Sequence, residues 1–529
     1  MSRYTETAGP QAAEGWQLSR VTPPSELFGA NGMRFGPDGR IYVVQAFGSQ
    51  VSALDPATGA RETVSPVGGE IVAPDDIAFD SHGTMYVTEV MSARVSSRTP
   101  NGEVKVIADN VPGANGIVAY QDRLFMDECR PGGRLWELYP DGRSPRLMAD
   151  NLPLPNALMV GPDGNIYFPQ IAVGEIWRCA LEGGRPEKFV DGLAVPTAVK
   201  FDKNGLLTTT QAGSGEITKI DIQSGVKTQV AKVRPGIDNF VIDDDNRLFI
   251  SHFVDGGVAE IMNDGTERVL SGAGMLGPFG LSVGNGTLFA ADGMSLITLT
   301  SDGQQSRPAQ FPEEGFPGFL RGIAAGPSNN VYANISAGNV VSYDLDARET
   351  SVIAEGLNEL YGLAVSPDGS LVVAEGGAGR VLIVTTGGEV STAASGLGRP
   401  MGVAVAGDGS CYVSDGDRGQ VVHVNGGTST VLDGLQKPHG VALSGDQLFV
   451  VDTGSKELIA FSLSTKQRQT VASNLPVGAP PGVTPKVLPG IAELVPGPLT
   501  PFSDLAIGSD GTVYIAADGD GSLMAVKRA

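Results

Sequence analysis

Six short, oxygen-bearing side chains recur in the first half of the chain at intervals of roughly 40 residues. They are Asn31, Asp75, Asn115, Asn156, Thr197 and Asp238. Five of them, Asn31, Asp75, Asn115, Asn156 and Asp238, carry the carboxylate or amide oxygens that a hard cation prefers, at about 2.3 to 2.6 Å. We therefore expect a divalent cation here, Ca²⁺ first, with Mg²⁺ or Mn²⁺ as alternatives. The other interpretation is that these side chains only solvate a wet channel.

A second recurring set lies shortly after each of these residues. It consists of Gln45, Glu89, Glu128, Gln170, Gln211 and His252. Glu89, Glu128 and His252 are the members that can transfer protons. A bound cation could polarise a carbonyl oxygen or activate a water, and one of these three groups would then act as the general base. The chain has no GxSxG or HExxH sequence, no phosphate loop and no dinucleotide fingerprint.

The polar residues recur because the chain is built of repeats. Twelve similar lines can be aligned, for example "ANGMRFGPDGRIYVVQ" and "PDDIAFDSHGTMYVTE". Each has an apolar segment, a turn that often contains Asp-Gly or Asn-Gly, and a second apolar segment. A period of about 40 residues with four β-like segments per repeat is typical of a propeller blade. The first strand of each blade lines the central channel, so we expect the polar residues to converge there.

We predict an all-β fold of two six-bladed β-propellers in tandem, over residues 23–271 and 277–529. A division into seven and five blades is the alternative. The last repeat lacks a fourth strand, which residues 15–22, "GWQLSRVT", could supply to close the second propeller. The Pro-rich insert 474–502 is predicted to contain no regular strand, because of its proline content, and to pack over a propeller face as a loop or lid.

The corresponding ring in the second half has a different character. Its members are Phe279, Arg321, Tyr361, Met401, His439 and Ser503. The ring has no carboxylate, so we do not expect it to bind a cation. We expect these bulky groups to fill the channel, with an anionic group between Arg321 and His439 as the alternative.

Composition limits the partners. The formal net charge of −22 argues against nucleic acid and against anionic membrane surfaces. A small-molecule substrate is the partner we expect, and a protein partner is left open. Three widely spaced cysteines predict no disulfide framework. The absence of a signal-peptide pattern and of an apolar run of about 18 residues predicts a cytoplasmic protein.

Several repeats resemble those of a known family. "PNALMVGPDGNIYF", "ANGMRFGPDGRIYVV" and "YGLAVSPDGSLVVAE" are similar to repeats of the gluconolactonase and senescence-marker-protein family and of related NHL-type propellers. The resemblance implies a divalent cation held by a Glu, two Asn and an Asp. The two Asn correspond to Asn115 and Asn156. Asn31 stands where the family has Glu, Thr197 stands where it has Asp, and the charges lie instead at Asp75 and Asp238.

Three functions follow from the sequence. The leading hypothesis is a metal-assisted hydrolase of a lactone or ester, with its site at the mouth of the first propeller. The first alternative is a lyase that removes a proton next to a carbonyl, which a resemblance to streptogramin-cleaving propeller lyases implies. The second alternative is a propeller without catalysis that binds or scaffolds partners.

Overall fold

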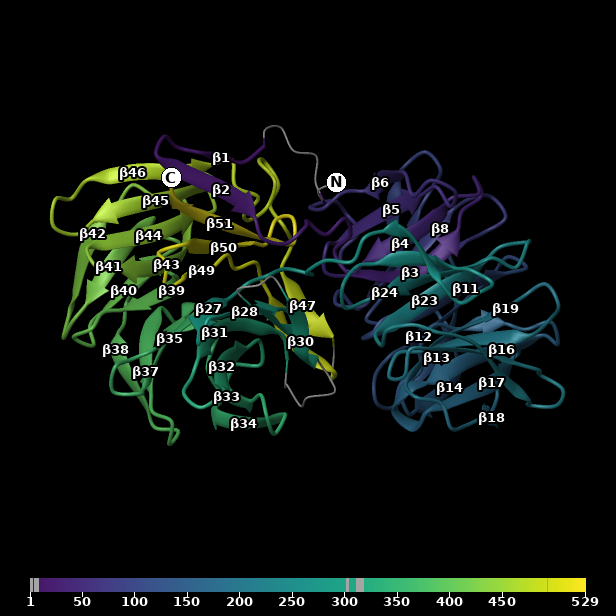
Figure 1. Cartoon of the computed structure of the whole chain (residues 1–529). Helices are drawn as coiled ribbons and strands as arrows, with labels where there is room; N and C mark the ends of the chain where they lie inside the picture. Colours follow the sequence, from purple (N-terminus) through teal and green to yellow (C-terminus); the bar gives the residue numbers. More distant parts are fainter. Residues whose placement is uncertain (1–2, 4–8, 301–303, 311–317, 492) are drawn as a thin grey trace. The chain divides into compact units, whose positions relative to one another are not determined.

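The regular structure of the chain is almost entirely β-strand (Figure 1). The computed structural model describes residues 3, 9–300, 304–310, 318–491 and 493–529. Within these residues the helical elements are two single 3₁₀ turns, η1 (Ile171–Val173) and η2 (Gly376–Ala378). None of the helical segments described is long and apolar enough to cross a membrane. The predicted all-β class is confirmed.

The chain divides into two compact units. The first unit comprises residues 26–273 and 484–494, and the second comprises residues 1–25, 274–483 and 495–529. The N-terminal residues belong to the second unit because β2 (Trp16–Arg20) pairs antiparallel with the last strand, β51 (Ser522–Arg528). The second unit is therefore discontinuous in sequence.

The first unit contains six antiparallel sheets of four strands each, in sequence order. The sheets are β3 (Ala30–Phe35), β4 (Ile41–Gln45), β5 (Gln50–Leu54) and β6 (Arg61–Ser65); β7 (Pro74–Phe79), β8 (Met85–Glu89), β9 (Arg94–Arg98) and β10 (Val104–Asp109); β11 (Ala114–Tyr120), β12 (Arg123–Glu128), β13 (Gly133–Leu138) and β14 (Arg146–Leu152); β15 (Met159–Val160), β16 (Asn165–Gln170), β17 (Glu175–Ala180) and β18 (Glu187–Val190); β19 (Pro196–Phe201), β20 (Leu207–Gln211), β21 (Glu216–Ile220) and β22 (Lys227–Lys232); and β23 (Ile237–Ile242), β24 (Leu248–His252), β25 (Val258–Ile261) and β26 (Glu267–Ser271).

The described part of the second unit also contains six antiparallel sheets, five of four strands and one of five, and two of them include an N-terminal strand. The sheets are β27 (Leu281–Gly284), β28 (Thr287–Asp292), β29 (Ser295–Thr300) and β30 (Gln305–Gln310); β31 (Leu320–Ala325), β32 (Asn330–Ile335), β33 (Asn339–Asp344) and β34 (Glu349–Ala354); β35 (Leu360–Val365), β36 (Leu371–Glu375), β37 (Arg380–Val384) and β38 (Val390–Ala394); β39 (Pro400–Val405), β40 (Cys411–Asp415), β41 (Gln420–Val424) and β42 (Thr428–Leu432); β43 (Pro438–Ser444), β44 (Gln447–Asp452), β45 (Glu457–Ser462) and β46 (Arg468–Ser473) with β1 (Gln11–Ala12); and β49 (Leu505–Ile507), β50 (Val513–Ala517), β51 and β2.

Within each unit, the first strands of successive sheets contact one another in cyclic order. In the first unit the order is β3, β7, β11, β15, β19 and β23, and β23 contacts β3. The second unit repeats this with β27, β31, β35, β39, β43 and β49, and β49 contacts β27. Hydrogen bonds join the ends of each cycle: Ser251 Oγ donates to the Asn31 carbonyl (2.8 Å), and Asp504 N donates to the Phe279 carbonyl (3.0 Å). Four-stranded antiparallel sheets that follow one another in this way are typical of β-propellers.

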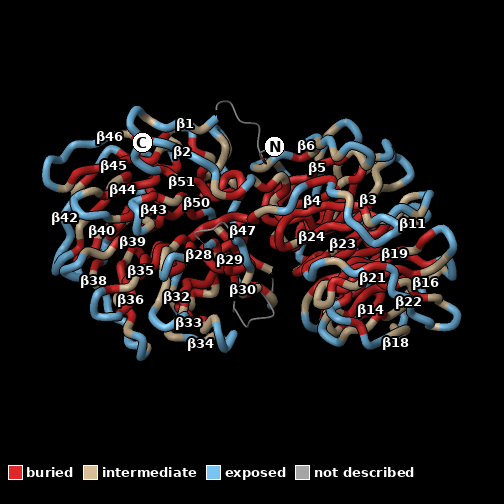
Figure 2. Tube along the Cα trace, in the orientation of Figure 1, coloured by how far each residue is buried: buried red, intermediate tan, exposed pale blue. Residues whose placement is uncertain are grey.

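The apolar core lies between neighbouring sheets. One cluster combines Met33 and Val43 of the first sheet with Phe249 and Val258 of the sixth. In the second unit, Trp16 of β2 packs edge-to-face on Phe449 of β44, with ring centroids 6.2 Å apart. Figure 2 shows buried residues along the strands and exposed residues at the turns. Burial between sheets therefore holds the N-terminal strand in the second unit.

The hairpin turns follow their sequence signals. Gly39 and Gly164 have φ values of 78° and 77°, a region that glycine enters without steric cost. In the first of these turns Asp38 Oδ1 accepts a hydrogen bond from Arg40 N (3.1 Å). The prediction that Asp-Gly pairs close these hairpins is confirmed.

The prediction that the Pro-rich insert contains no regular strand is wrong. Within residues 474–502, β47 (Leu488–Ile491) and β48 (Val495–Leu499) form a two-stranded sheet, and residue 492 lies outside the described residues. Each strand of a two-stranded sheet is an edge, so a proline can occupy positions whose missing N–H would face away from the partner. Beyond β48 the insert packs on the second unit, where the Thr500 hydroxyl lies 2.8 Å from the Tyr361 hydroxyl.

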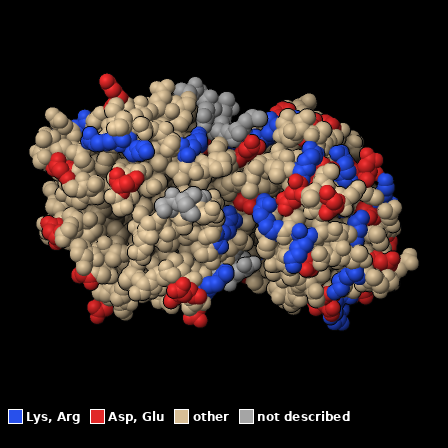
Figure 3. Space-filling view, in the orientation of Figure 1, with Lys and Arg blue, Asp and Glu red and all other residues tan. Residues whose placement is uncertain are grey.

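Charge is distributed differently over the two units. On the face drawn in Figure 3, acidic and basic side chains are interspersed over the first unit, and the second unit shows wide areas with neither.

Candidate functional site

A β-bulge positions the recurring polar residue in five of the six sheets of the first unit, the fourth sheet being the exception. In the first sheet Ala30 pairs with Gln45 and Met33 pairs with Val43, so Asn31 and Gly32 together face a single residue of β4. The same shift occurs where β7 meets β8, where β11 meets β12 and where β23 meets β24. A bulge interrupts the strict alternation of a strand and re-aims a side chain. In the sheets that have the bulge, it thereby turns a residue at the start of the first strand away from the sheet's two faces.

The residue after the recurring position allows the first strands to approach closely. A Cβ atom on Gly32 would lie 2.6 Å from Asp76 Cα, and one on Gly116 would lie 2.8 Å from Ala157 Cα. Real side chains do not tolerate such distances, so these glycines let neighbouring backbones meet. This close approach brings polar side chains from successive sheets together.

Asn31, Asp75 and Asp238 form the charged part of the candidate site. Asn31 Nδ2 donates a hydrogen bond to Asp75 Oδ1 (2.8 Å), and both side chains are buried. Burial raises the pKa of Asp75 well above its usual range, and the carboxylates of Asp238 and Asp76 raise it further. Burial also raises the pKa of Asp238, to about 7, with Asp76 adding to the shift and Lys200 opposing it. The structure therefore brings these residues within electrostatic range of one another.

Asn115 and Asn156 lie next to each other at the following two sheets. The side-chain oxygens of both accept from the same backbone group, Ala157 N, at 3.4 Å for Asn115 and 2.7 Å for Asn156. Asn156 Nδ2 is 3.9 Å from Cys129 Sγ. Burial raises the pKa of the Cys129 thiol well above its usual range, and Asp127, Asp75 and Asp238 contribute. Cys129 therefore lies near both the amide pair and the acidic residues.

Three further charged residues at this site were not singled out by the sequence analysis. Asp76 Oδ2 accepts from Ile117 N (3.1 Å), and Asp127 Oδ1 accepts from Gly116 N (3.0 Å). The other oxygen of each carboxylate is buried without a hydrogen-bond partner among the described residues. Lys200 has a pKa lowered to about 7, mainly by burial and next by Arg34.

The sequence does contain a signal for Asp76. It follows Asp75 at a position where four of the other five repeats of this half have glycine or alanine: Gly32, Gly116, Ala157 and Ala198. A carboxylate at a position that mostly holds a small residue indicates that Asp76 has a specific role at this site.

Glu89, predicted to transfer protons, is held by several partners of its own sheet. Its Oε2 accepts from Val72 N (2.7 Å) and from Arg94 Nη2 (2.7 Å), and Ser96 donates to its Oε1. Three glutamines at the same position anchor the loop leading into their sheets in the same way: Gln45 to Phe28 N, Gln170 to Leu154 N and Gln211 to Ala194 N. Glu89 therefore anchors the loop that leads into β7.

Glu128 and His252 have different surroundings. Glu128 is buried beneath Arg134, whose Nη2 is 2.6 Å from Oε1, and it also accepts from Arg130 and from the Trp136 indole (3.0 Å). His252 is fully buried at the end of β24. Against the effect of burial, the hydrogen bond from Arg234 and then the nearby His252 lower the pKa of Asp255. Within the described part of the chain, no hydrogen bond or ion pair connects Glu89 or Glu128 to the five predicted metal ligands.

The donor set suits a cation only if amide oxygens take part. Among the described residues, no group of three or more His, Cys, Asp or Glu side chains is arranged to hold a metal ion. A cation at this site would therefore need oxygens from Asn31, Asn115 or Asn156 beside Asp75 and Asp238. Asn31 Oδ1 is buried without a hydrogen-bond partner among the described residues. A buried oxygen that accepts no hydrogen bond suits the role of a cation ligand.

The corresponding position of the second unit is filled by large side chains. Arg321 is fully buried over the Tyr361 ring, 5.0 Å from its centroid, and donates to the Leu360 carbonyl (3.3 Å). Phe502 of the insert packs against Tyr361 and against His439, with centroids 5.8 and 6.1 Å apart. Burial lowers the pKa of His439 to about 3, with nearby cations contributing. These contacts agree with the expectation that this ring is filled.

Comparison with known proteins gives partial likenesses. No family model matches the chain. A gluconolactonase from Zymomonas mobilis subsp. mobilis is 28% identical over 128 residues, which cover 20% of this chain and 36% of that protein. A streptogramin B lyase structure matches 52% of this chain and 94% of its own at 17% identity, with a TM-score of 0.40. A GH74 enzyme from Niastella koreensis matches 96% and 99% at 13% identity, with a TM-score of 0.42.

Proposed function

We propose that the two units are six-bladed β-propellers and that the first is a metal-assisted hydrolase of a small lactone or ester. The hydrogen bond between Asn31 and Asp75, together with the charge of Asp238 acting on Asp75, carries the proposal. Asn115 and Asn156, which share the backbone N–H of Ala157, would supply the further oxygens. The partial match to a gluconolactonase supports hydrolysis as the reaction class. That match spans only about a third of the relative's length, so the reaction rests on the chemistry of the site.

The electrostatics of the cluster explain why a cation would bind. Asp75 and Asp238 repel each other inside the protein, and each has a raised pKa as a result of burial and of nearby carboxylates. A divalent cation would replace this repulsion with attraction, and the amide oxygens of Asn31, Asn115 and Asn156 would add ligands without further charge. When bound, Ca²⁺, or Mg²⁺ or Mn²⁺, would polarise the substrate carbonyl.

The three predicted proton-transfer groups have different charged neighbours. Glu89 and Glu128 each neutralise a partly buried arginine, and movement of either carboxylate would break an ion pair. His252, which lies beside Asp255, is the group we favour for proton transfer. The carboxylate of Asp255 would stabilise the imidazolium form that appears when His252 takes up a proton.

A second candidate function is proton abstraction next to a carbonyl, followed by elimination. The observation that favours it is Lys200, a buried amine whose pKa is lowered to about 7 beside Asp76 and Asp238. An amine whose pKa is lowered toward neutrality can act as a base. Reaction in ¹⁸O-labelled water separates the two functions, because hydrolysis incorporates the label into the product and elimination does not.

Metal content and activity together test the proposal. We expect about one equivalent of calcium per chain by elemental analysis of dialysed protein purified without chelators, and chelator-sensitive hydrolysis in a panel of sugar lactones and aryl esters. The double variant Asp75→Asn/Asp238→Asn should lose the metal and on the order of 100-fold or more in kcat/KM.

The matched control is Asp244→Asn/Asp245→Asn, which makes the same charge change at two exposed residues in the turn between β23 and β24. It should retain metal and activity. Unchanged metal content and unchanged hydrolysis in the double variant would contradict the site, and a wild-type protein that neither holds a cation nor cleaves any member of the panel would contradict the function.

A further inference from the structure

Arg34 connects four neighbouring sheets of the first unit. It lies on β3, and its Nε donates to the Ile77 carbonyl of β7 (3.1 Å). Its Nη2 donates to the Ile117 carbonyl of β11 (3.1 Å), and its Nη1 lies 3.5 Å from Met159 Sδ on β15. One side chain therefore contacts the first strands of the three sheets that follow its own.

The geometry of the guanidinium makes this connection rigid. Each of these first strands pairs with one neighbour only, the second strand of its own sheet, so carbonyls on its other edge need other donors. A guanidinium is planar and presents five N–H groups in a fixed fork. By donating to Ile77 and Ile117 together, Arg34 holds β7 and β11 at a set distance from each other and from β3.

Asp76 holds the same residue of β11. Its Oδ2 accepts from Ile117 N (3.1 Å), so Ile117 is fixed through both its N–H and its carbonyl. Burial lowers the pKa of Arg34, and the Asp76 carboxylate opposes that shift. Asp76 thus supplies a negative charge near the guanidinium that Arg34 places among the strands.

The four connected sheets carry four of the five proposed cation ligands. Each of these ligands lies two or three residues before the residue through which its sheet is connected, and they are Asn31, Asp75, Asn115 and Asn156. Groups behind the ligands of a metal orient them, and their loss commonly costs roughly 10- to 100-fold in metal affinity. Arg34 is placed to act in this way, because it sets the spacing of the strands at or before whose starts the four ligands lie.

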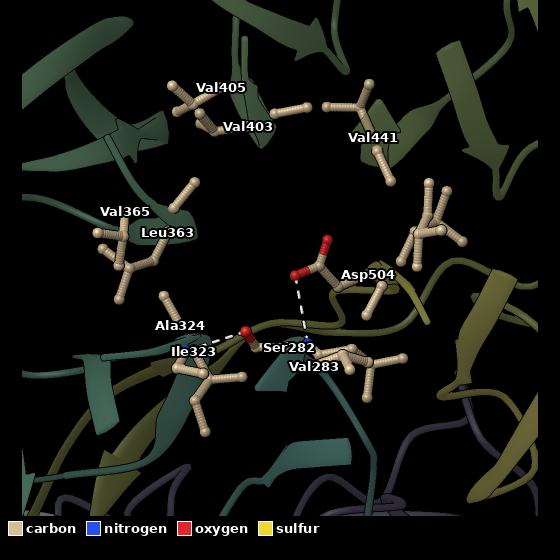
Figure 4. Close-up of a pocket in the computed structure, with 18 of the residues that line it drawn as sticks. Ser282, Val283, Ile323, Ala324, Leu363, Val365, Val403, Val405, Val441 and Asp504 are labelled. Carbon is tan, nitrogen blue, oxygen red and sulfur yellow. Dashed lines mark hydrogen bonds between the residues drawn. The ribbon is translucent and has the colours of Figure 1, made fainter. Parts of the chain in front are cut away.

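The second unit shows that six sheets of this kind are joined in a cycle without such an arginine. At the corresponding position its repeats have only serine or alanine: Ser282, Ala324, Ala364, Ala404, Ala442 and Ala506. All of these line a cavity of about 360 Å³, which Figure 4 shows as open space between the first strands. The fold therefore does not require a large or charged side chain here, and Arg34 serves a purpose specific to the first unit.

We propose that Arg34 is a positioning residue for the cation site of the first unit and that it sets the preference of this site for Ca²⁺ over Mg²⁺. The inference rests on the proposed function, since it needs a cation at these ligands. Ca²⁺ binds oxygens at about 2.3 to 2.6 Å, whereas Mg²⁺ demands an octahedron at about 2.0 to 2.1 Å, and the choice between them depends on the size and flexibility of the ligand cage. Strands held apart by Arg34 keep the cage at the wider spacing, and strands released from Arg34 can move closer.

The charge of Arg34 alone predicts the opposite effect. A positive charge near a cation site repels the cation, so its removal should strengthen binding. If Arg34 acts by positioning, its removal should weaken binding. The two explanations therefore differ in the sign of the change.

Calorimetric titration of the metal-free, full-length protein with CaCl₂ and with MgCl₂ measures this sign. Arg34→Met keeps an unbranched side chain and removes the donors. It should weaken Ca²⁺ binding at least tenfold and change Mg²⁺ binding less than threefold, so the preference for Ca²⁺ falls. Arg34→Lys keeps the charge but has no planar fork to bridge two carbonyls, and it should weaken Ca²⁺ binding by a similar factor.

Lys200→Met is the matched control. Lys200 occupies the same repeat position on β19, its charge acts on Asp238, and it makes no hydrogen bond to another side chain or carbonyl within the described residues. Its removal changes the charge without releasing a strand, so Ca²⁺ should bind at least as tightly as in the wild type.

Ca²⁺ binding that is tighter or unchanged in a folded Arg34 variant would overturn the positioning role and leave the proposed function intact. An equal loss for both cations would overturn the role in selectivity, and a wild-type protein that binds no Ca²⁺ would overturn both proposals. Urea denaturation of the metal-free variants shows whether they fold. Arg34→Lys, which retains an aliphatic stem and one donor group, keeps the test decisive if Arg34→Met does not fold.

Discussion

The same repeat produces two interiors with opposite chemistry. In the first unit the recurring positions hold Asn31, Asp75 and Asp238, which meet in a buried acidic cluster. In the second unit the same positions hold Arg321 and Tyr361, which pack on each other. Both units share the four-stranded sheets, the bulge in the first strand and the acceptor at the end of the second strand. The comparison shows that the repeat fixes where these side chains are placed and leaves their chemistry open.

The reason lies in what each repeat position contacts. Residues between sheets must fill a core, and residues that anchor loops must accept a hydrogen bond, so both kinds of position are restricted. The recurring position lies outside the cores between sheets and outside the loop anchors, so its side chain is less restricted in size and polarity. It can therefore be exchanged as a set, from polar in the first unit to bulky in the second, without changing the fold.

The largest effect we expect concerns the two buried carboxylates with pKa values of about 7. For Asp504, the native pKa lies above the value of about 3.8 in the unfolded chain, so the native state binds more protons between these values. Stability should therefore fall as the pH rises from 4 to 7. Relative to wild type, Asp504→Asn should gain about 4 kcal/mol in the free energy of unfolding across this range.

Chemical denaturation of both proteins at several pH values measures this gain. Asp238→Asn should show the same trend in the metal-free protein, because burial raises the pKa of Asp238 to a similar value. Added Ca²⁺ should reduce the trend for Asp238 alone, if only the first unit binds the cation. A difference between Asp504→Asn and wild type that is constant with pH would show that Asp504 titrates normally.

A smaller effect is expected for Arg321, which tests whether the ring of the second unit is filling. Arg321→Ala should reduce the free energy of unfolding by about 3 kcal/mol, because it opens a void beneath Tyr361. Arg321→Met, which preserves most of the volume and removes a buried charge, should change it by less than about 1 kcal/mol. Thr197→Ala, at a recurring position of the first unit, should lower the free energy of unfolding by about 1 kcal/mol, because it removes the hydrogen bond with the Thr210 hydroxyl.

Urea denaturation followed by fluorescence measures these three changes in the free energy of unfolding. If Arg321→Met were as destabilising as Arg321→Ala, the guanidinium would be needed for its charge rather than its size. The ring of the second unit would then be a binding site for an anion, whereas the ring of the first unit would be a binding site for a cation.

Much of this architecture could be predicted from the sequence. The period of roughly 40 residues, the Asp-Gly turns and the alternating apolar segments indicated the sheets, because each of these signals is local. The recurring position was also found, since it stands at a fixed place in every repeat. The strands of the Pro-rich insert were missed because a short two-stranded sheet uses edges on which proline is tolerated.

The chemistry of the site could be predicted only in part. Asp76 and Asp127 were missed because their importance comes from contacts with neighbouring sheets, to Ile117 N and Gly116 N. Lys200 lies on β19 at a position whose burial and neighbours only the fold reveals. A sequence shows residue types at a repeat position, but the pKa of a buried group depends on which charges the other repeats bring to it.

The smallest effect we expect separates anchoring from proton transfer at Glu89. Glu89→Gln converts this residue to the type found at the same position in three other sheets of the first unit, where the side-chain oxygen accepts from a loop N–H. The bond to Val72 N should survive, and the weakened contact with Arg94 should cost about 1 kcal/mol of stability. Hydrolytic activity should change less than threefold. His252→Gln, measured in parallel, should lower kcat by at least 100-fold, because it removes the group we favour for proton transfer. If Glu89→Gln instead abolished activity while the protein remained as stable as predicted, the acid rather than the anchor would matter, and Glu89 would return to the catalytic set.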